Sequence, residues 1–194
     1  MTLITLVRHG QTDWNLDRRI QGSTDVPLNE TGRGHAREAA ALLAGATHHT
    51  IYASPLARAH ETARIIADEI GLGEPELVPG LREREFGEAE GMFVTDYIER
   101  YGDWHADVPG AETFDQVRDR ALTALDIIAR DARRRSAPVA ESVIVVAHGG
   151  VIRALLDHAS SGTMPPLGVP LMNGSVHRFE AAPGMLRLLE TVTL

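Results

Sequence analysis

Three short hydrophobic runs are separated by longer stretches in which apolar residues recur every three or four positions. The runs cover residues 3–7, 50–53 and 143–147. Nearly continuous, β-branched runs of this length are typical of strands that are covered on both faces. The longer periodic stretches predict helices over residues 30–43, 56–70, 114–135 and 150–158. Because strands and helices alternate, the pattern predicts an α/β fold built on a mainly parallel sheet.

Two segments depart from this alternation. Residues 175–180 and 185–190 flank the turn Ala182-Pro183-Gly184 and predict a β-hairpin, whose antiparallel strands would make the sheet mixed. Residues 88–112 are the least regular part of the chain, and we expect a small helical, lid-like insertion there. The whole chain, residues 1–194, is therefore predicted to form a single domain.

Composition excludes several classes of function. The net charge of −8 argues against a protein that binds nucleic acid or an anionic membrane. The chain has no cysteine, which excludes disulfides, thiolate metal sites and cysteine nucleophiles, and all its 19 basic residues are arginine, which excludes a lysine nucleophile. No apolar run approaches the roughly 18 residues of a membrane span. We therefore expect a soluble, cytoplasmic protein.

Each hydrophobic run is followed by residues that can bind an anion. Arg8 and His9 follow the first run, Arg58 lies shortly after the second, and His148 follows the third. In an open parallel sheet, ligands bind beyond the carboxyl ends of the strands. We therefore expect these four side chains to converge on one site, where the guanidinium groups would suit phosphate oxygens.

Such a site could transfer a phosphoryl group. A neutral imidazole is a good nucleophile, and Arg8 and Arg58 would disfavour a proton on His9. His148 would be a second donor to the phosphoryl oxygens, so the developing charge could be met without a metal. The other histidines lack the spacing of metal ligands, and no metal site is expected.

A general acid for the leaving oxygen is still required. The stretch of residues 81–87, Leu-Arg-Glu-Arg-Glu-Phe-Gly, offers two carboxyl groups. Chemistry alone does not choose between Glu83 and Glu85.

Residues 6–15, Leu-Val-Arg-His-Gly-Gln-Thr-Asp-Trp-Asn, resemble the signature of the histidine phosphatase superfamily in its phosphoglycerate-mutase-like branch. The similarity continues in the family's order through residues 27–32, 54–63, 81–87 and 147–153. An ordered set of motifs over most of the chain is far more specific than a lone Arg-His-Gly. The resemblance implies a three-layer α/β/α sandwich with a mixed, mostly parallel sheet.

The resemblance also implies roles for individual residues. His9 would become phosphohistidine, while Arg8, Arg58 and His148 would hold the phosphoryl group. Asn15 would donate a hydrogen bond to it. Family members need no metal, and no cofactor is expected.

Three further positions follow from the same resemblance. Gln21 and Gly22 would line the phosphate pocket. The family's acid falls on Glu83, because Leu81 two positions before it and Phe86 three positions after it set the register. One departure concerns residues 89–91, which are Ala-Glu-Gly where the family often has Trp-Glu-Gly.

The predicted function is metal-independent hydrolysis of small-molecule phosphomonoesters through phosphohistidine, because the compact chain resembles the phosphatase members. One alternative is a cofactor-dependent phosphoglycerate mutase, which performs the same chemistry but returns the phosphoryl group to a second hydroxyl. The other alternative is a non-catalytic protein that binds phosphate esters. By resemblance alone, the chain would also be able to form a homodimer.

Overall fold

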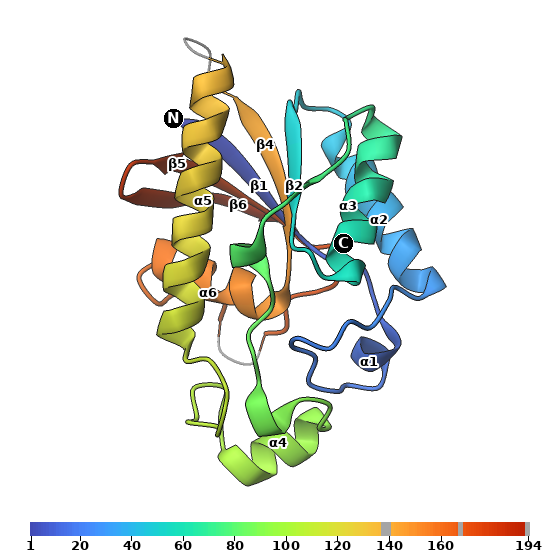
Figure 1. The fold of residues 1–194 in the computed structure, drawn as a ribbon, viewed down its shortest axis with the longest axis vertical. Coiled ribbons are helices and arrows are strands. Elements are labelled where there is room, and N and C mark those ends of the chain that lie inside the picture. The colour runs from blue at the N-terminus through green and yellow to red at the C-terminus, as the bar shows by residue number, and fades with distance from the viewer. Residues whose placement is uncertain (137–140, 167–168, 193–194) are drawn as a thin grey trace.

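A six-stranded mixed sheet lies between two layers of helices in the computed structural model, which describes residues 1–136, 141–166 and 169–192 (Figure 1). The strands are β1 (Thr2–Arg8), β2 (Thr50–Ala53), β3 (Glu76–Leu77), β4 (Ser142–Ala147), β5 (Val176–Ala182) and β6 (Met185–Val192). The helices are α1 (Asp13–Leu16), α2 (Glu30–Leu43), α3 (Ala57–Ile70), α4 (Val94–Tyr101), α5 (Phe114–Ser136) and α6 (Gly149–Ala159), with 3₁₀ turns η1 (Pro79–Leu81) and η2 (Gly87–Ala89).

The sheet is mostly parallel, in the order β3-β2-β4-β1-β5-β6. Strands β3, β2, β4 and β1 are paired in parallel, whereas β5 and β6 are antiparallel. The α/β sandwich and the terminal hairpin predicted from the sequence are confirmed.

Both faces of the central strands are covered. Along β4, Val143 and Val145 pack into the core formed with α5 and α6, while Ile144 and Val146 pack into the core formed with α2 and α3. Figure 1 shows these two pairs of helices on opposite sides of the sheet. All four residues are fully buried, which explains why the strand is continuously apolar from Val143 to Ala147 rather than at alternate positions.

Local signals explain the boundaries of α2 and α3. The Asn29 side chain accepts a hydrogen bond from the backbone N–H of Gly32 and so caps the start of α2. Helix α3 ends at Gly71, whose φ of 74° is in the left-handed region that glycine adopts without strain.

The segment 88–112 contains the end of η2 and all of α4, and it packs with neighbouring residues into a third, small core. Tyr97 of α4 is completely buried, and Ile20, Phe86 and Val108 pack in the same cluster. Figure 1 shows α4 at the end of the molecule where α1 also lies. Helix α4 lies within this segment, and the lid-like insertion stays a prediction.

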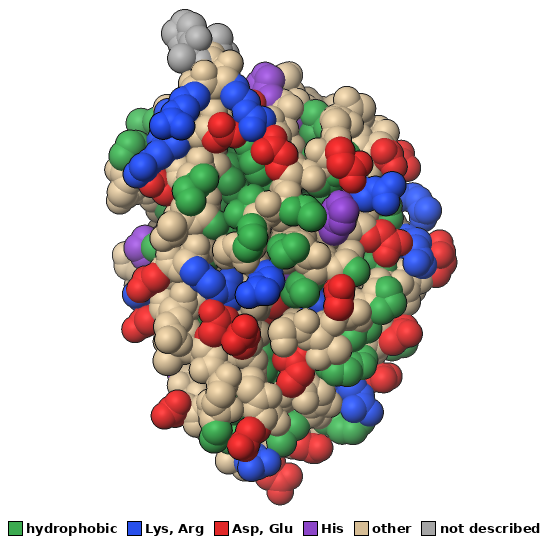
Figure 2. All heavy atoms as spheres, viewed as in Figure 1, with side chains coloured by type: hydrophobic (Ala, Val, Ile, Leu, Met, Phe, Trp, Pro, Cys, Tyr) green, Lys and Arg blue, Asp and Glu red, His purple; other side chains and the backbone are tan. Residues whose placement is uncertain are grey.

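The surface mixes charges of both signs. On the face shown in Figure 2, arginine side chains are dispersed among aspartate and glutamate side chains. None of the helices in the described ranges combines the length and the apolarity that crossing a membrane requires.

Candidate active site

The register of β1 against β4 brings two histidines together. Arg8 pairs with Ala147, and the backbone N–H of His9 donates to the carbonyl of Ala147 over 3.0 Å. His9 and His148 therefore leave the sheet as neighbours, with ring centroids 5.1 Å apart. The same edge carries Ser54, because β2 pairs with the other side of β4.

The loop that carries His9 is pressed against the first turn of α2. A Cβ atom on Gly10 would lie 2.1 Å from the carbonyl oxygen of Gly32, and a Cβ atom on Gly32 would lie 2.1 Å from the carbonyl oxygen of Gln11. Neither position can hold a side chain without moving backbone. The Gly10 N–H also donates to Thr62 Oγ1 over 3.0 Å. These contacts hold the backbone around His9 in place.

His9 is arranged as a neutral imidazole. Its Nδ1 lies 2.7 Å from the carbonyl oxygen of Gly10, which can only accept, so we assign the proton to Nδ1 and the lone pair to Nε2. Burial, followed by the positive charges of Arg58 and Arg8, holds the pKa of His9 well below its usual value of 6.5. Nε2 is therefore unprotonated at neutral pH.

His148 has a different hydrogen-bond partner. Its Nε2 lies 2.7 Å from Ser54 Oγ, which also accepts the backbone N–H of Leu56. We assign the serine hydrogen to the bond with Nε2, which leaves the ring proton on Nδ1. Burial, then Arg58, lowers the pKa of His148 well below 6.5. His148 is thus neutral with a donor at Nδ1.

Arg8 and Arg58 are anchored through their terminal nitrogens. Arg58 is fully buried in the first turn of α3 and donates to the carbonyl oxygens of Thr24 at 2.9 Å and Gly22 at 2.8 Å. Arg8 donates to the carbonyl oxygen of Leu171. Burial lowers the pKa of Arg8 to about 10. Because this value is still well above 7, the guanidinium is charged at neutral pH.

Of the two candidate carboxyl groups, the structure brings Glu83 to the site and leaves Glu85 exposed. Glu83 is only 7% exposed, and its charge acts on both Arg8 and Arg58. Its Oε2 accepts the N–H of Gly150 over 3.0 Å, two residues beyond His148. Alternation along an extended segment does not explain this choice, because it would place Glu83 and Glu85 on the same face. The segment does not alternate, since Arg84 is buried next to Glu83.

Asn15 and Gln21 form one network beside His9. The Asn15 amide nitrogen donates to Gln21 Oε1 over 3.3 Å, and Thr12 Oγ1 donates to the same oxygen over 2.8 Å. Gly22 contributes its carbonyl oxygen to Arg58, as described above. The residues predicted by resemblance to surround the phosphate are therefore brought together, while their roles stay predictions.

Asn173 belongs to this network and was not predicted. Its amide nitrogen lies 3.0 Å from the carbonyl oxygen of His9, 3.2 Å from that of Gly10 and 3.1 Å from Asn15 Oδ1. It lies in the turn before β5, where an asparagine next to Gly174 is a common turn signal. No local pattern distinguishes such a turn residue from one that supports a site 164 positions away.

Four buried nitrogens from the converging residues have no hydrogen-bond partner within the described ranges. They are Arg8 Nε, Gln21 Nε2, Arg58 Nε and His148 Nδ1. Each buried donor without a partner costs about 1–3 kcal/mol, so four together indicate a ligand with several acceptor oxygens. Within the same ranges, no cluster of histidine and carboxylate side chains is suited to a metal ion. The arrangement can therefore bind a tetrahedral oxyanion beside the unprotonated nitrogen of His9.

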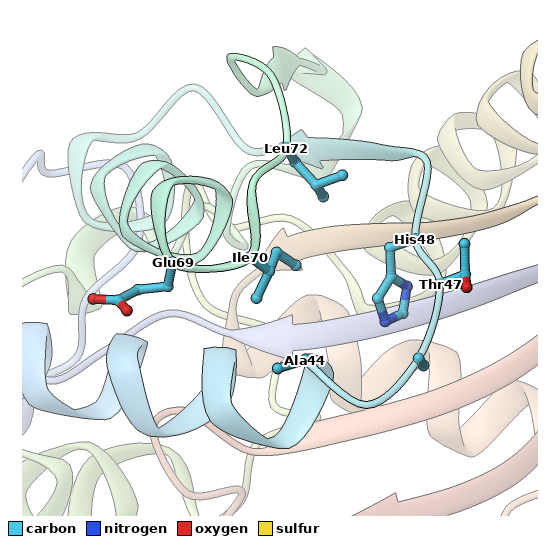
Figure 3. Close-up of a pocket in the computed structure, with 7 residues that line it drawn as sticks. Ala44, Thr47, His48, Glu69, Ile70 and Leu72 are labelled. Atoms are coloured by element: carbon cyan, nitrogen blue, oxygen red, sulfur yellow. The ribbon is translucent and has the colours of Figure 1, made fainter.

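A cavity of about 440 Å³ lies elsewhere, between the carboxyl ends of α2 and α3 (Figure 3). Its walls are Ala44, Ala46, Thr47, His48, Glu69, Ile70 and Leu72. Because Thr47 and His48 precede β2, this cavity is at the opposite end of the strand from Ser54. It contains none of the residues that converge around His9.

Comparison with known proteins connects this geometry to a family. The model described as histidine phosphatase superfamily (branch 1) matches residues 4–192. A Bacillus subtilis protein described as uncharacterized phosphatase PhoE is 37% identical over 97% of this chain and 93% of its own length. A 2,3-bisphosphoglycerate-dependent phosphoglycerate mutase from Gloeobacter violaceus is 34% identical over 82% of this chain and 78% of its own.

Solved structures agree with the sequence comparison. A mycobacterial glucosyl-3-phosphoglycerate phosphatase in complex with VO3 superposes with a TM-score of 0.81. It is 27% identical, and the match covers 97% of each chain.

Proposed function

Because the chain belongs to branch 1 of the histidine phosphatase superfamily, we propose that it hydrolyses small-molecule phosphomonoesters through a phosphohistidine at His9. The observation that carries this proposal is the set of four unpartnered buried nitrogens from the residues around that imidazole. A phosphoryl group has the several acceptor oxygens that such donors require. The phosphatase relatives support hydrolysis as the outcome.

In the first step, the lone pair of His9 Nε2 attacks phosphorus. A P–N bond forms while the ester P–O bond breaks, and the bonding electrons go to the leaving oxygen. Glu83, entering the step as a carboxylic acid, gives its proton to that oxygen so that an alcohol departs. Arg8, Arg58 and His148 stabilise the charge on the phosphoryl oxygens during the transfer.

In the second step, water replaces the alcohol. The Glu83 carboxylate takes a proton from water as the water oxygen bonds to phosphorus and the P–N bond breaks. His9 returns to its neutral form and inorganic phosphate is released. None of these steps requires a metal or a cofactor, so a chelator is expected to leave the rate unchanged.

A phosphate-release screen across metabolite monoesters tests the proposal, with and without EDTA. The screen should include sugar phosphates, phosphoglycerates and phosphoamino acids, and a coupled assay should follow phosphoglycerate isomerisation in parallel. We expect release of phosphate from at least one monoester. Isomerisation faster than release would support the mutase alternative instead. Phosphate binding without turnover of any ester would support the non-catalytic alternative.

The pH dependence of the reaction should reflect the neutral state of His9. Because its pKa lies well below 6.5, acidification through that value does not protonate the nucleophile. We expect kcat/KM to show no decline as the pH is lowered from about 8 to about 6, where an ordinary histidine would begin to lose activity. A pH profile at low substrate concentration measures this. A decline of kcat/KM centred near pH 6.5 would contradict the assignment of a neutral His9 with a lowered pKa.

A further inference from the structure

The loop of residues 22–24 is held from two directions by groups of opposite charge. On one side, the guanidinium of Arg58 donates to the carbonyl oxygens of Gly22 and Thr24. On the other, Glu90 Oε1 accepts the backbone N–H of Gly22 over 2.9 Å and that of Thr24 over 3.0 Å. The same two residues therefore connect a positive and a negative side chain.

This double contact determines where the Arg58 guanidinium lies. The terminal nitrogens of Arg58 are committed to the two carbonyl oxygens, and its Nε is the group left without a partner in the described part of the chain. If the loop moves, the guanidinium moves with it. The loop has little rigidity of its own at Gly22, so its position depends on what holds its N–H groups.

Glu90 fits closely against the loop. A Cβ atom on Gly22 would lie 2.4 Å from Glu90 Oε2, so the carboxylate occupies the space that a side chain would fill. The negative charge of Glu90 also acts on Arg58 and favours its charged form against the effect of burial. Glu90 follows η2, in the segment 88–112, and thus connects that segment to the site.

We propose that Glu90 is a positioning residue of the phosphate site, fixing the Arg58 guanidinium through the loop of residues 22–24. This inference rests on the proposed function, because it assigns Arg58 to phosphate binding. Glu90 itself does not contact the phosphoryl group. It acts by holding the two N–H groups whose residues hold Arg58.

The affinity for inorganic phosphate, measured by isothermal titration calorimetry, tests this role. Replacing Glu90 by alanine is expected to raise the dissociation constant about tenfold or more, since both charge-assisted hydrogen bonds to the loop are lost. Glu90→Gln retains an oxygen that can accept the same two N–H groups and should restore part of the affinity. The matched control is Glu88→Ala, two positions away, whose exposed carboxylate lies 3.6 Å from Arg100.

A double-mutant cycle separates positioning from general destabilisation. If Glu90 acts through Arg58, adding Glu90→Ala to Arg58→Ala should weaken phosphate binding by less than about twofold further. Equal losses in the presence and absence of Arg58 would overturn the inference, as would a Glu90→Ala variant that binds like Glu88→Ala. If wild-type protein binds no phosphate, the proposed function fails instead, so the two failures are distinguishable.

Discussion

Replacing His9 by alanine is expected to lower kcat by about 10⁴-fold or more and to abolish formation of a phosphorylated protein. The reason is that His9 provides the atom that bonds to phosphorus, and no second nucleophile stands in its place. His148 is the neighbouring imidazole, but its Nε2 is engaged with Ser54. Initial rates measure the first effect. Intact-protein mass spectrometry after rapid quenching at high pH measures the second, because phosphohistidine is labile in acid.

The matched control is His60→Ala, which removes a partly exposed imidazole from α3 beside Glu74. It should retain the wild-type rate and the phosphoryl label. His9→Ala should still bind inorganic phosphate, since the two arginines remain. A label that persists in His9→Ala would show that another residue is the nucleophile and would end the proposed mechanism.

Glu83→Gln is expected to produce the second largest loss, about 10²–10⁴-fold in kcat for esters of alkyl alcohols. The amide cannot donate the carboxyl proton, so the alkoxide must leave without it. For an aryl ester such as p-nitrophenyl phosphate, whose leaving group is stable as an anion, the first step should be much less affected. Values of kcat/KM over a series of leaving groups therefore measure the role of Glu83 as the acid of the first step, because they do not include the hydrolysis of phosphohistidine.

Glu85→Gln is the control for this prediction, because it makes the same chemical change two positions away on an exposed side chain. It should behave as wild type with every ester. An equal loss in the rate of the first step across all leaving groups in Glu83→Gln would indicate that the carboxylate orients the chain around Gly150 rather than giving a proton to the leaving oxygen.

The central strands and the long helices could be predicted because their pattern is local. Helix α2 has the predicted bounds, Glu30–Leu43. In contrast, α1 and β3 are only four and two residues long and carry no hydrophobic period. Such short elements form because the surrounding fold supplies their partners. Near α1, for example, Thr12 forms an isolated antiparallel β-bridge with Leu28. Tertiary contacts of this kind leave no trace in a single sequence.

The same distinction between local patterns and tertiary contacts applies to the residues of the candidate site. His9 and His148 could be paired from the sequence because both follow predicted parallel strands, and adjacent strand ends must meet. The choice between Glu83 and Glu85 depended on the resemblance until the structure showed which of them is buried. Asn173 could not be found at all, because its place in the site comes from a tertiary contact with the backbone of His9, at the end of the neighbouring strand.

The contact between Gly10 and Gly32 has a consequence for engineering this chain toward other substrates. Even one added methyl group at either position would have to displace backbone, and the nearest movable backbone carries the proposed nucleophile. Libraries should therefore leave both positions unchanged and place their diversity in residues 88–112, with the exception of Glu90, which contacts the loop that holds Arg58.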